Sequence, residues 1–175
     1  MAIINLKNNS LSSVTELPSG ISGQNYPAFE AYLSANQSVT HDSTTKAQCN
    51  TEVFDTDSCY DNSTNYRFTP TVAGKYFVYG SIGCSSGANG DNLISIMEIR
   101  KNGGSSSPIY VQHDNRNGGS GNTQVIHGTG IIDFNGSSDY IELYGAVYPV
   151  SSGNEAFSGN ATLRYTKFGA YRIGD

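Results

Sequence analysis

Three histidines are the side chains of this chain best suited to catalysis. His41, His113 and His127 are scattered among Ser, Thr and Asp, whereas a histidine acts as a general base or a metal ligand only beside a suitable partner. The chain contains no H-E-x-x-H, C-x-x-C or G-x-S-x-G motif, and no phosphate-cradling Gly loop that opens a helix. The sequence therefore predicts a non-enzymatic protein without a cofactor.

The best candidate metal ligands are three closely spaced aspartates. Asp55, Asp57 and Asp61 offer the oxygen atoms that calcium prefers. The glycine and the terminal glutamate of an EF-hand loop are missing from this stretch. A solvated acidic loop is therefore the favoured interpretation: no metal site is assigned, and calcium binding is left open.

The three cysteines are Cys49, Cys59 and Cys84, an odd number without the spacing of metal ligands. We interpret them as small buried hydrophobic residues and not as a disulfide framework.

Composition excludes two classes of partner. The net charge is −5 with a pI near 5.0, and no Lys or Arg cluster is present for phosphate binding, so nucleic acid is not expected as a partner. No apolar run approaches the ~18 residues of a membrane span. The start of the chain lacks the apolar segment and cleavage site of a secretory signal, so we expect synthesis in a cytoplasm.

Turn-forming residues recur between short β-branched and aromatic runs, which is typical of an all-β sandwich or barrel. We expect a hairpin over 65–83, in which Ala73 and Gly74 form the turn. We count eight to ten strands in all, the number in a jelly roll built from two Greek keys. Two short extended runs are expected within 47–54, and the other main strands at 27–33, 93–100, 108–113, 123–134, 139–147 and 161–173.

The second strand of that hairpin, Lys75 to Ile82, carries apolar side chains on both faces. Tyr76, Val78 and Ile82 alternate with Phe77, Tyr79 and Ser81. Such a strand is usually central in its sheet and covered on both sides, here by a second sheet and by a neighbouring subunit.

Residues 1–25 form an extended N-terminal arm before a domain at 26–175. The alternatives for the arm are a disordered terminus and a peptide that docks on a partner. Its apolar anchors in the second case are Ile3, Ile4, Leu6, Leu11, Val14 and Leu17.

Five segments in the right order make residues 27–173 resemble the C1q-like jelly-roll domain, which is shared with the tumour necrosis factor ligands. The segments are Ala28 to Ala31, Tyr60-Asp61 with Phe68 to Phe77, Lys101 to Gly103, Asp139 to Leu143, and Phe168 to Ile173. The chain departs from this family in having no collagen-like repeat before the domain.

The resemblance implies a two-sheet jelly roll and a homotrimer packed around a threefold axis. The candidates for the axis-facing layer are Phe29, Tyr76, Val78, Tyr144 and Phe168. The alternative for each of them is an ordinary core residue, and the sequence does not say which sheet faces the axis.

The arm also resembles the opening of small structural proteins of tailed bacteriophages, which implies a virion protein made in the host cytoplasm. The function expected first is decoration or cementing of a capsid or tail through the arm. One alternative is a receptor-binding fibre tip whose loops, such as 115–122 and 148–157, contact host glycans or proteins. An alternative of another class is a free carbohydrate- or protein-binding module.

Overall fold

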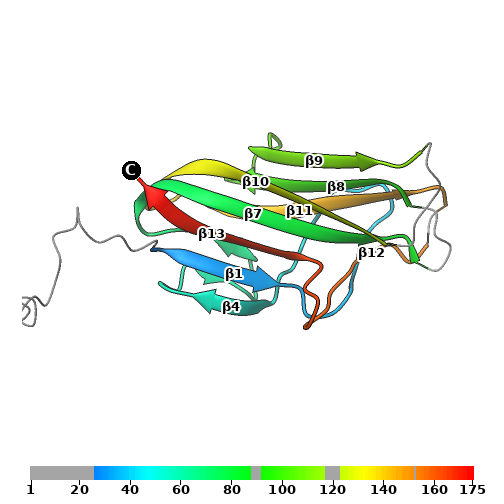
Figure 1. Cartoon of the computed structure of the whole chain (residues 1–175), viewed down its shortest axis with the longest axis horizontal. Coiled ribbons are helices and arrows are strands. Elements are labelled where there is room, and N and C mark those ends of the chain that lie inside the picture. The colour runs from blue at the N-terminus through cyan, green and yellow to red at the C-terminus, as the bar shows by residue number, and fades with distance from the viewer. Residues whose placement is uncertain (1–25, 88–91, 117–122, 152) are drawn as a thin grey trace, which may run out of the picture.

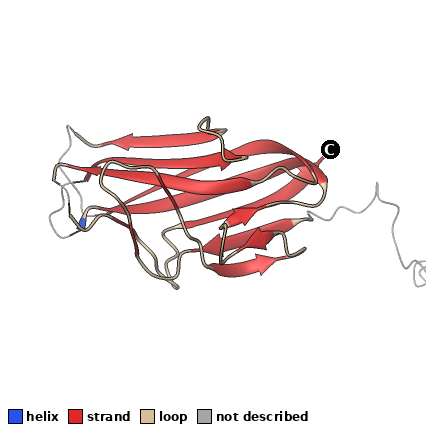
Figure 2. Ribbon diagram, turned by 180° about the vertical axis from the view of Figure 1, so that it is seen from behind, coloured by secondary structure: helices blue, strands red, loops and turns tan. Residues whose placement is uncertain are grey.

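The computed structural model describes residues 26–87, 92–116, 123–151 and 153–175, which form two β-sheets packed face to face (Figure 1). These residues contain thirteen strands, of which eight have five or more residues, and no α-helix. Strands make up most of the ribbon in Figure 2. The predicted all-β two-sheet sandwich is confirmed, with more short strands than expected.

The first sheet, sheet A, has the order β2-β12-β7-β13-β1-β4, and β10 pairs with the other edge of β7. All its pairs are antiparallel. Its strands are β1 (Ala28–Tyr32), β2 (Gln37–Ser38), β4 (Thr51–Asp55), β7 (Ala73–Ser85), β10 (Thr123–Asn135), β12 (Ala156–Phe157) and β13 (Lys167–Gly174).

The second sheet, sheet B, has the order β5-β6-β11-β8-β9, and β3 also pairs with β11. Its strands are β3 (Thr45–Lys46), β5 (Tyr60–Asp61), β6 (Arg67–Phe68), β8 (Asn92–Lys101), β9 (Ile109–Asp114) and β11 (Ile141–Pro149).

The strand β7 is central in sheet A, as its sequence predicted. It pairs with β10 over the whole of both strands and with β13 on its other side. Tyr76, Val78 and Ile82 are fully buried between the sheets, while Phe77 and Tyr79 on the opposite face are half-buried. One of its two apolar faces therefore belongs to the core and the other to the outside of the single chain.

The predicted hairpin at 65–83 is wrong. The strand β6 pairs with β5 and β11 in sheet B, whereas β7 lies in sheet A. Residues 69–72 thus connect the two sheets, and Ala73 and Gly74 belong to β7.

The strands β8 and β9 pair in antiparallel fashion and form a hairpin that turns after Lys101. Asn102 and Gly103 both have positive φ, 56° and 67°, as the tight turns favoured in hairpins require.

Aromatic rings from both sheets fill one end of the core. The Phe29 ring stacks on Phe68 at 4.4 Å and on Tyr60 at 4.8 Å between ring centroids, and it meets Phe168 edge-on at 4.9 Å. Such contacts add about 0.5–1.5 kcal/mol each to the gain from burial. Because Phe29 and Phe168 come from sheet A and the other two from sheet B, this cluster joins the sheets.

Candidate oligomer interface

The outer face of sheet A carries one row of side chains across four strands, and three of them are large and apolar. Backbone pairing sets Ala28 opposite Tyr171, Tyr171 opposite Phe77, and Phe77 opposite Ile131. Side chains of directly opposed residues lie on the same face of a sheet. The order β1-β13-β7-β10 therefore places this row away from the core.

The centre of this face is a group that we call the apolar patch, formed by Phe77, Tyr79, Ile131 and Tyr171. The Phe77 ring lies 5.4 Å from Tyr171 and 6.3 Å from Tyr79 between centroids. Ile131 is 61% exposed, whereas the next residue along β10, Ile132, points inward and is buried. Soluble chains usually cover a contiguous apolar group of this kind with a partner or a ligand.

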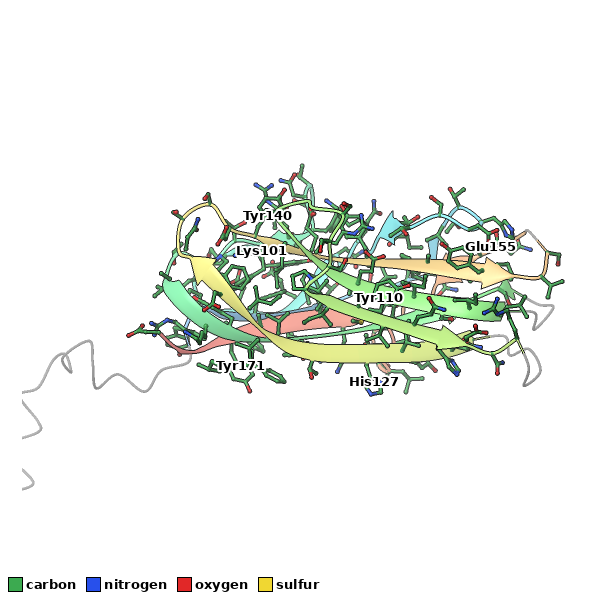
Figure 3. All side chains as sticks on the ribbon, turned by 90° about the horizontal axis from the view of Figure 1, so that it is seen from above. Lys101, Tyr110, His127, Tyr140, Glu155 and Tyr171 are labelled. Atoms are coloured by element: carbon green, nitrogen blue, oxygen red, sulfur yellow. The ribbon has the colours of Figure 1, made fainter. Side chains whose placement is uncertain are left out.

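Polar rows border the apolar patch on both sides. On one side, near the start of β7, Lys75 forms an ion pair with Asp133, with 3.5 Å between Nζ and Oδ1. On the other side, Lys167 lies opposite Ser81, and Ser81 opposite His127. Figure 3 shows Tyr171 and His127 on the same outer side of the molecule, away from Tyr140. An apolar centre with a polar rim is the usual anatomy of a protein interface.

A hydrogen bond crosses this face between strands that do not touch. The Tyr79 hydroxyl of β7 donates to Glu30 Oε2 of β1 at 2.8 Å. Burial, followed by the bond to Glu30, raises the pKa of Tyr79, so the phenol stays protonated and keeps donating at neutral pH.

The outer face of sheet B differs because its charged side chains pair with one another. Lys46 Nζ lies 2.5 Å from Glu142 Oε1, and Arg100 Nε lies 2.7 Å from Glu98 Oε2. The Arg100 guanidinium also covers the Tyr144 ring at 4.4 Å. These polar groups satisfy each other within one chain, so sheet A is the better candidate for contact with a partner.

The residues that sequence reasoning assigned to the trimer axis do not lie together on one outer face. Phe29, Tyr76, Val78 and Phe168 are fully buried between the two sheets of a single chain, because they sit on the inward side of the sheet A strands. They are core residues, the alternative that the sequence left open. Tyr144 is half-buried on the outer side of sheet B.

Sequence reasoning missed the apolar patch, although its signal was present. The alternation along 75–82 separated Phe77 and Tyr79 from Tyr76 and Val78, and the final strand likewise separated Tyr171 from Phe168. Alternation identifies two faces but not which of them is inward.

The acidic loop does not present its carboxylates as a cation site. The Asp61 oxygens accept hydrogen bonds from the backbone N–H groups of Ser63, Thr64 and Asn65 and from the Asn65 amide. These bonds hold the pKa of Asp61 well below its usual range. Asp55 likewise accepts from the Tyr60 N–H at 2.7 Å. Within the described ranges, no group of three His, Cys, Asp or Glu side chains is arranged to hold a metal.

Within the part of the chain that the structure describes, the histidines and cysteines do not form nucleophile–base pairs. His41 faces Glu155 Oε1 and Asp42 Oδ2, each at 3.1 Å, so both ring nitrogens face carboxylates. His113 contacts Gln124 Oε1 at 3.2 Å. Cys49, Cys59 and Cys84 are all buried, as predicted, and burial raises the pKa of Cys84 to about 12. That thiol is therefore protonated at neutral pH, which makes it a poor nucleophile.

The arm expected at residues 1–25, with its six apolar anchors, lies outside the described residues. In the part of the chain that the structure describes, no helix is long and apolar enough to cross a membrane.

The two antiparallel sheets form a jelly roll, the fold that solved structures of tumour necrosis factor and C1q domains also have. Among solved structures, the chain is similar to Eiger TNF of S. frugiperda (TM-score 0.57, 8% identity, 85% of this chain and 92% of that chain).

The globular domain of zebrafish complement 1qA protein aligns with a TM-score of 0.53 at 14% identity, over 84% of this chain and 97% of that chain. Murine APRIL aligns with a TM-score of 0.58 at 9% identity, over 83% and 98%. These likenesses confirm the predicted fold. No family model and no curated protein matches the sequence.

Proposed function

We propose that this chain is a non-enzymatic homotrimeric jelly-roll protein whose copies associate through the outer face of sheet A. The exposed Ile131 within the ring cluster of Phe77, Tyr79 and Tyr171 carries the proposal. The resemblance to the C1q and tumour necrosis factor domains supports three copies around one axis. Such a ring closes through the same contact repeated three times.

Ile131→Asp tests the interface, because it places a charge within the apolar patch, opposite Phe77. We expect the full-length variant to be monomeric by light scattering coupled to size exclusion, at concentrations where the unaltered chain is a trimer. Val150→Asp is the matched control, since Val150 is 67% exposed at the end of β11, outside the apolar patch. A trimeric Ile131→Asp variant would place the interface elsewhere.

In this proposal, the trimer decorates or cements the capsid or tail of a tailed bacteriophage through the N-terminal arms. Two observations support it: the opening sequence resembles small phage structural proteins, and the described chain begins beside the C-terminus, at one end of the sandwich (Figure 1). A trimer would therefore direct three arms from the same end, and three linked attachments bind far more tightly than one.

A full-length variant with Ile3→Asp, Ile4→Asp and Leu6→Asp tests the attachment. The triple variant should then no longer sediment together with phage particles, while the Val150→Asp control should still do so. Unimpaired binding would contradict attachment through the arm. Blocking of host adsorption by the purified protein would instead favour the receptor-binding alternative.

A further inference from the structure

Tyr79 lies across a neighbouring strand in an unusual way. Pairing sets Tyr79 of β7 opposite Gly169 of β13, and Gly169 opposite Glu30 of β1. Because adjacent strands are about 4.8 Å apart, the backbones of β7 and β1 are separated by about 10 Å. The Tyr79 hydroxyl nevertheless reaches Glu30 at 2.8 Å, so the ring must extend over β13.

Gly169 leaves the space that this position needs. A Cβ atom on residue 169 would lie 2.4 Å from the Tyr79 hydroxyl oxygen and 2.5 Å from Cζ. Both distances are far below van der Waals contact, so any larger residue would lift the ring away from the sheet. Only the absence of a side chain on the middle strand lets Tyr79 lie down over it.

Glu30 is held in turn from its other side. Arg164 Nη1 lies 3.5 Å from Glu30 Oε1, and the Arg164 guanidinium covers the Tyr32 ring at 4.9 Å. Arg164 has a φ of 47° at the end of a turn in which its N–H donates to Asn160 O at 2.9 Å. A residue other than glycine seldom adopts this conformation, which here directs the arginine toward Glu30.

We propose that Glu30 is a positioning residue for the trimer: it holds the Tyr79 ring down over Gly169 and thereby shapes the apolar patch that a second copy of this chain contacts. The inference rests on the proposed function. A ring that is already fixed loses less conformational freedom when the second copy binds. Without the bond to Glu30, Tyr79 would rotate freely beside Phe77 and would have to be ordered at each of the three contacts.

Tyr79→Phe removes the hydroxyl and keeps the ring, while Glu30→Ala removes the acceptor. For either full-length variant we expect the overall trimer dissociation constant to rise about a hundredfold, since ordering one freed side chain corresponds to about fivefold at each of three contacts. Because both act on one bond, the double variant should be no weaker than either single one. Glu30→Gln keeps an acceptor oxygen and should restore most of the association.

Two controls show whether weaker association comes from the positioning of Tyr79, from impaired folding, or from the loss of any tyrosine hydroxyl. Tyr110→Phe removes a surface hydroxyl that donates to Gln112 Oε1 at 2.9 Å on β9, and it should leave association unchanged. In the monomeric Ile131→Asp background, Tyr79→Phe should remain folded and lose only the stability that one intrachain hydrogen bond contributes, whereas a loss large enough to unfold the chain would assign Tyr79 to the fold and not to association.

The outcomes distinguish the two proposals. If Ile131→Asp abolishes the trimer but Tyr79→Phe and Glu30→Ala associate within about twofold of the unaltered chain, the positioning role is wrong and the interface stands. Equal losses from Glu30→Gln and Glu30→Ala would also overturn it, since the acceptor would then not matter. If Ile131→Asp remains trimeric, or the unaltered chain is a monomer, both proposals fail.

Discussion

At the scale of single residues, the direction of one side chain decides between core and surface. Phe29 and Glu30 are neighbours in β1, yet Phe29 is fully buried among aromatic rings and Glu30 lies on the outer face. The sequence could predict that these two residues face opposite sides. It could not predict which side is inward, because both sides of sheet A carry aromatic residues.

Phe29→Ala tests the assignment of Phe29 to the core. Loss of the ring that stacks on Phe68 and Tyr60 should lower the free energy of unfolding by about 3–5 kcal/mol. Phe54→Ala is the matched control, because Phe54 is 44% exposed on β4, and it should cost less than about 1 kcal/mol.

Both changes are best made in the Ile131→Asp background and compared by urea denaturation, so that association does not contribute. If the two variants lost similar stability, the placement of Phe29 in the joint core of the two sheets would be wrong.

At the scale of elements, Asp139 joins the ends of the two sheets. Its carboxylate accepts from Lys101 at 2.8 Å and from Asn102 Nδ2 at 2.7 Å at the β8 end, and from the Asn135 N–H at 3.0 Å at the β10 end. The bonds from Lys101 and then Asn102 lower the pKa of Asp139. The ionised form is therefore the one that stabilises the fold.

Asp139→Asn should lower the free energy of unfolding by about 1–2 kcal/mol at pH 7. A carboxyl whose pKa is lowered by folding stabilises above its ordinary value near 3.9, and the effect disappears as the pH falls through the lower folded value. The difference between the unaltered chain and the variant should thus shrink below about pH 4.

Unfolding of both proteins between pH 3 and pH 7 measures this difference. Asp57→Asn, at an exposed aspartate, is the control and should change the free energy of unfolding by less than about 0.5 kcal/mol at pH 7. A pH-independent loss for Asp139→Asn would show that its charge does not join the sheets.

Most strands could be predicted from local sequence, but their pairing could not. The alternating runs of β7, β8, β10 and β11 lie where they were expected. The hairpin at 65–83 was wrong because a short connection between sheets has the same local pattern as a hairpin turn. What places β6 in sheet B is its pairing with β11, where Phe68 meets Ile141, a contact remote in sequence.

At the scale of the whole molecule, the two outer faces have different chemistry. The outer face of sheet B pairs its own charges, whereas the outer face of sheet A has an apolar centre between polar rows. The resemblance predicted a trimer, but four of the five residues suggested for its axis lie in the core. The sequence could not indicate the apolar patch, because Tyr171, Phe77 and Ile131 become neighbours only in the folded chain.

The most direct test of this account is the solution mass of the purified full-length chain, measured by light scattering coupled to size exclusion at several concentrations. A homotrimer would give three times the chain mass of 18.7 kDa and would dissociate only on dilution or on introduction of Ile131→Asp. A mass of one chain at every concentration would contradict it, because the apolar patch would then remain exposed in solution without a second copy to cover it.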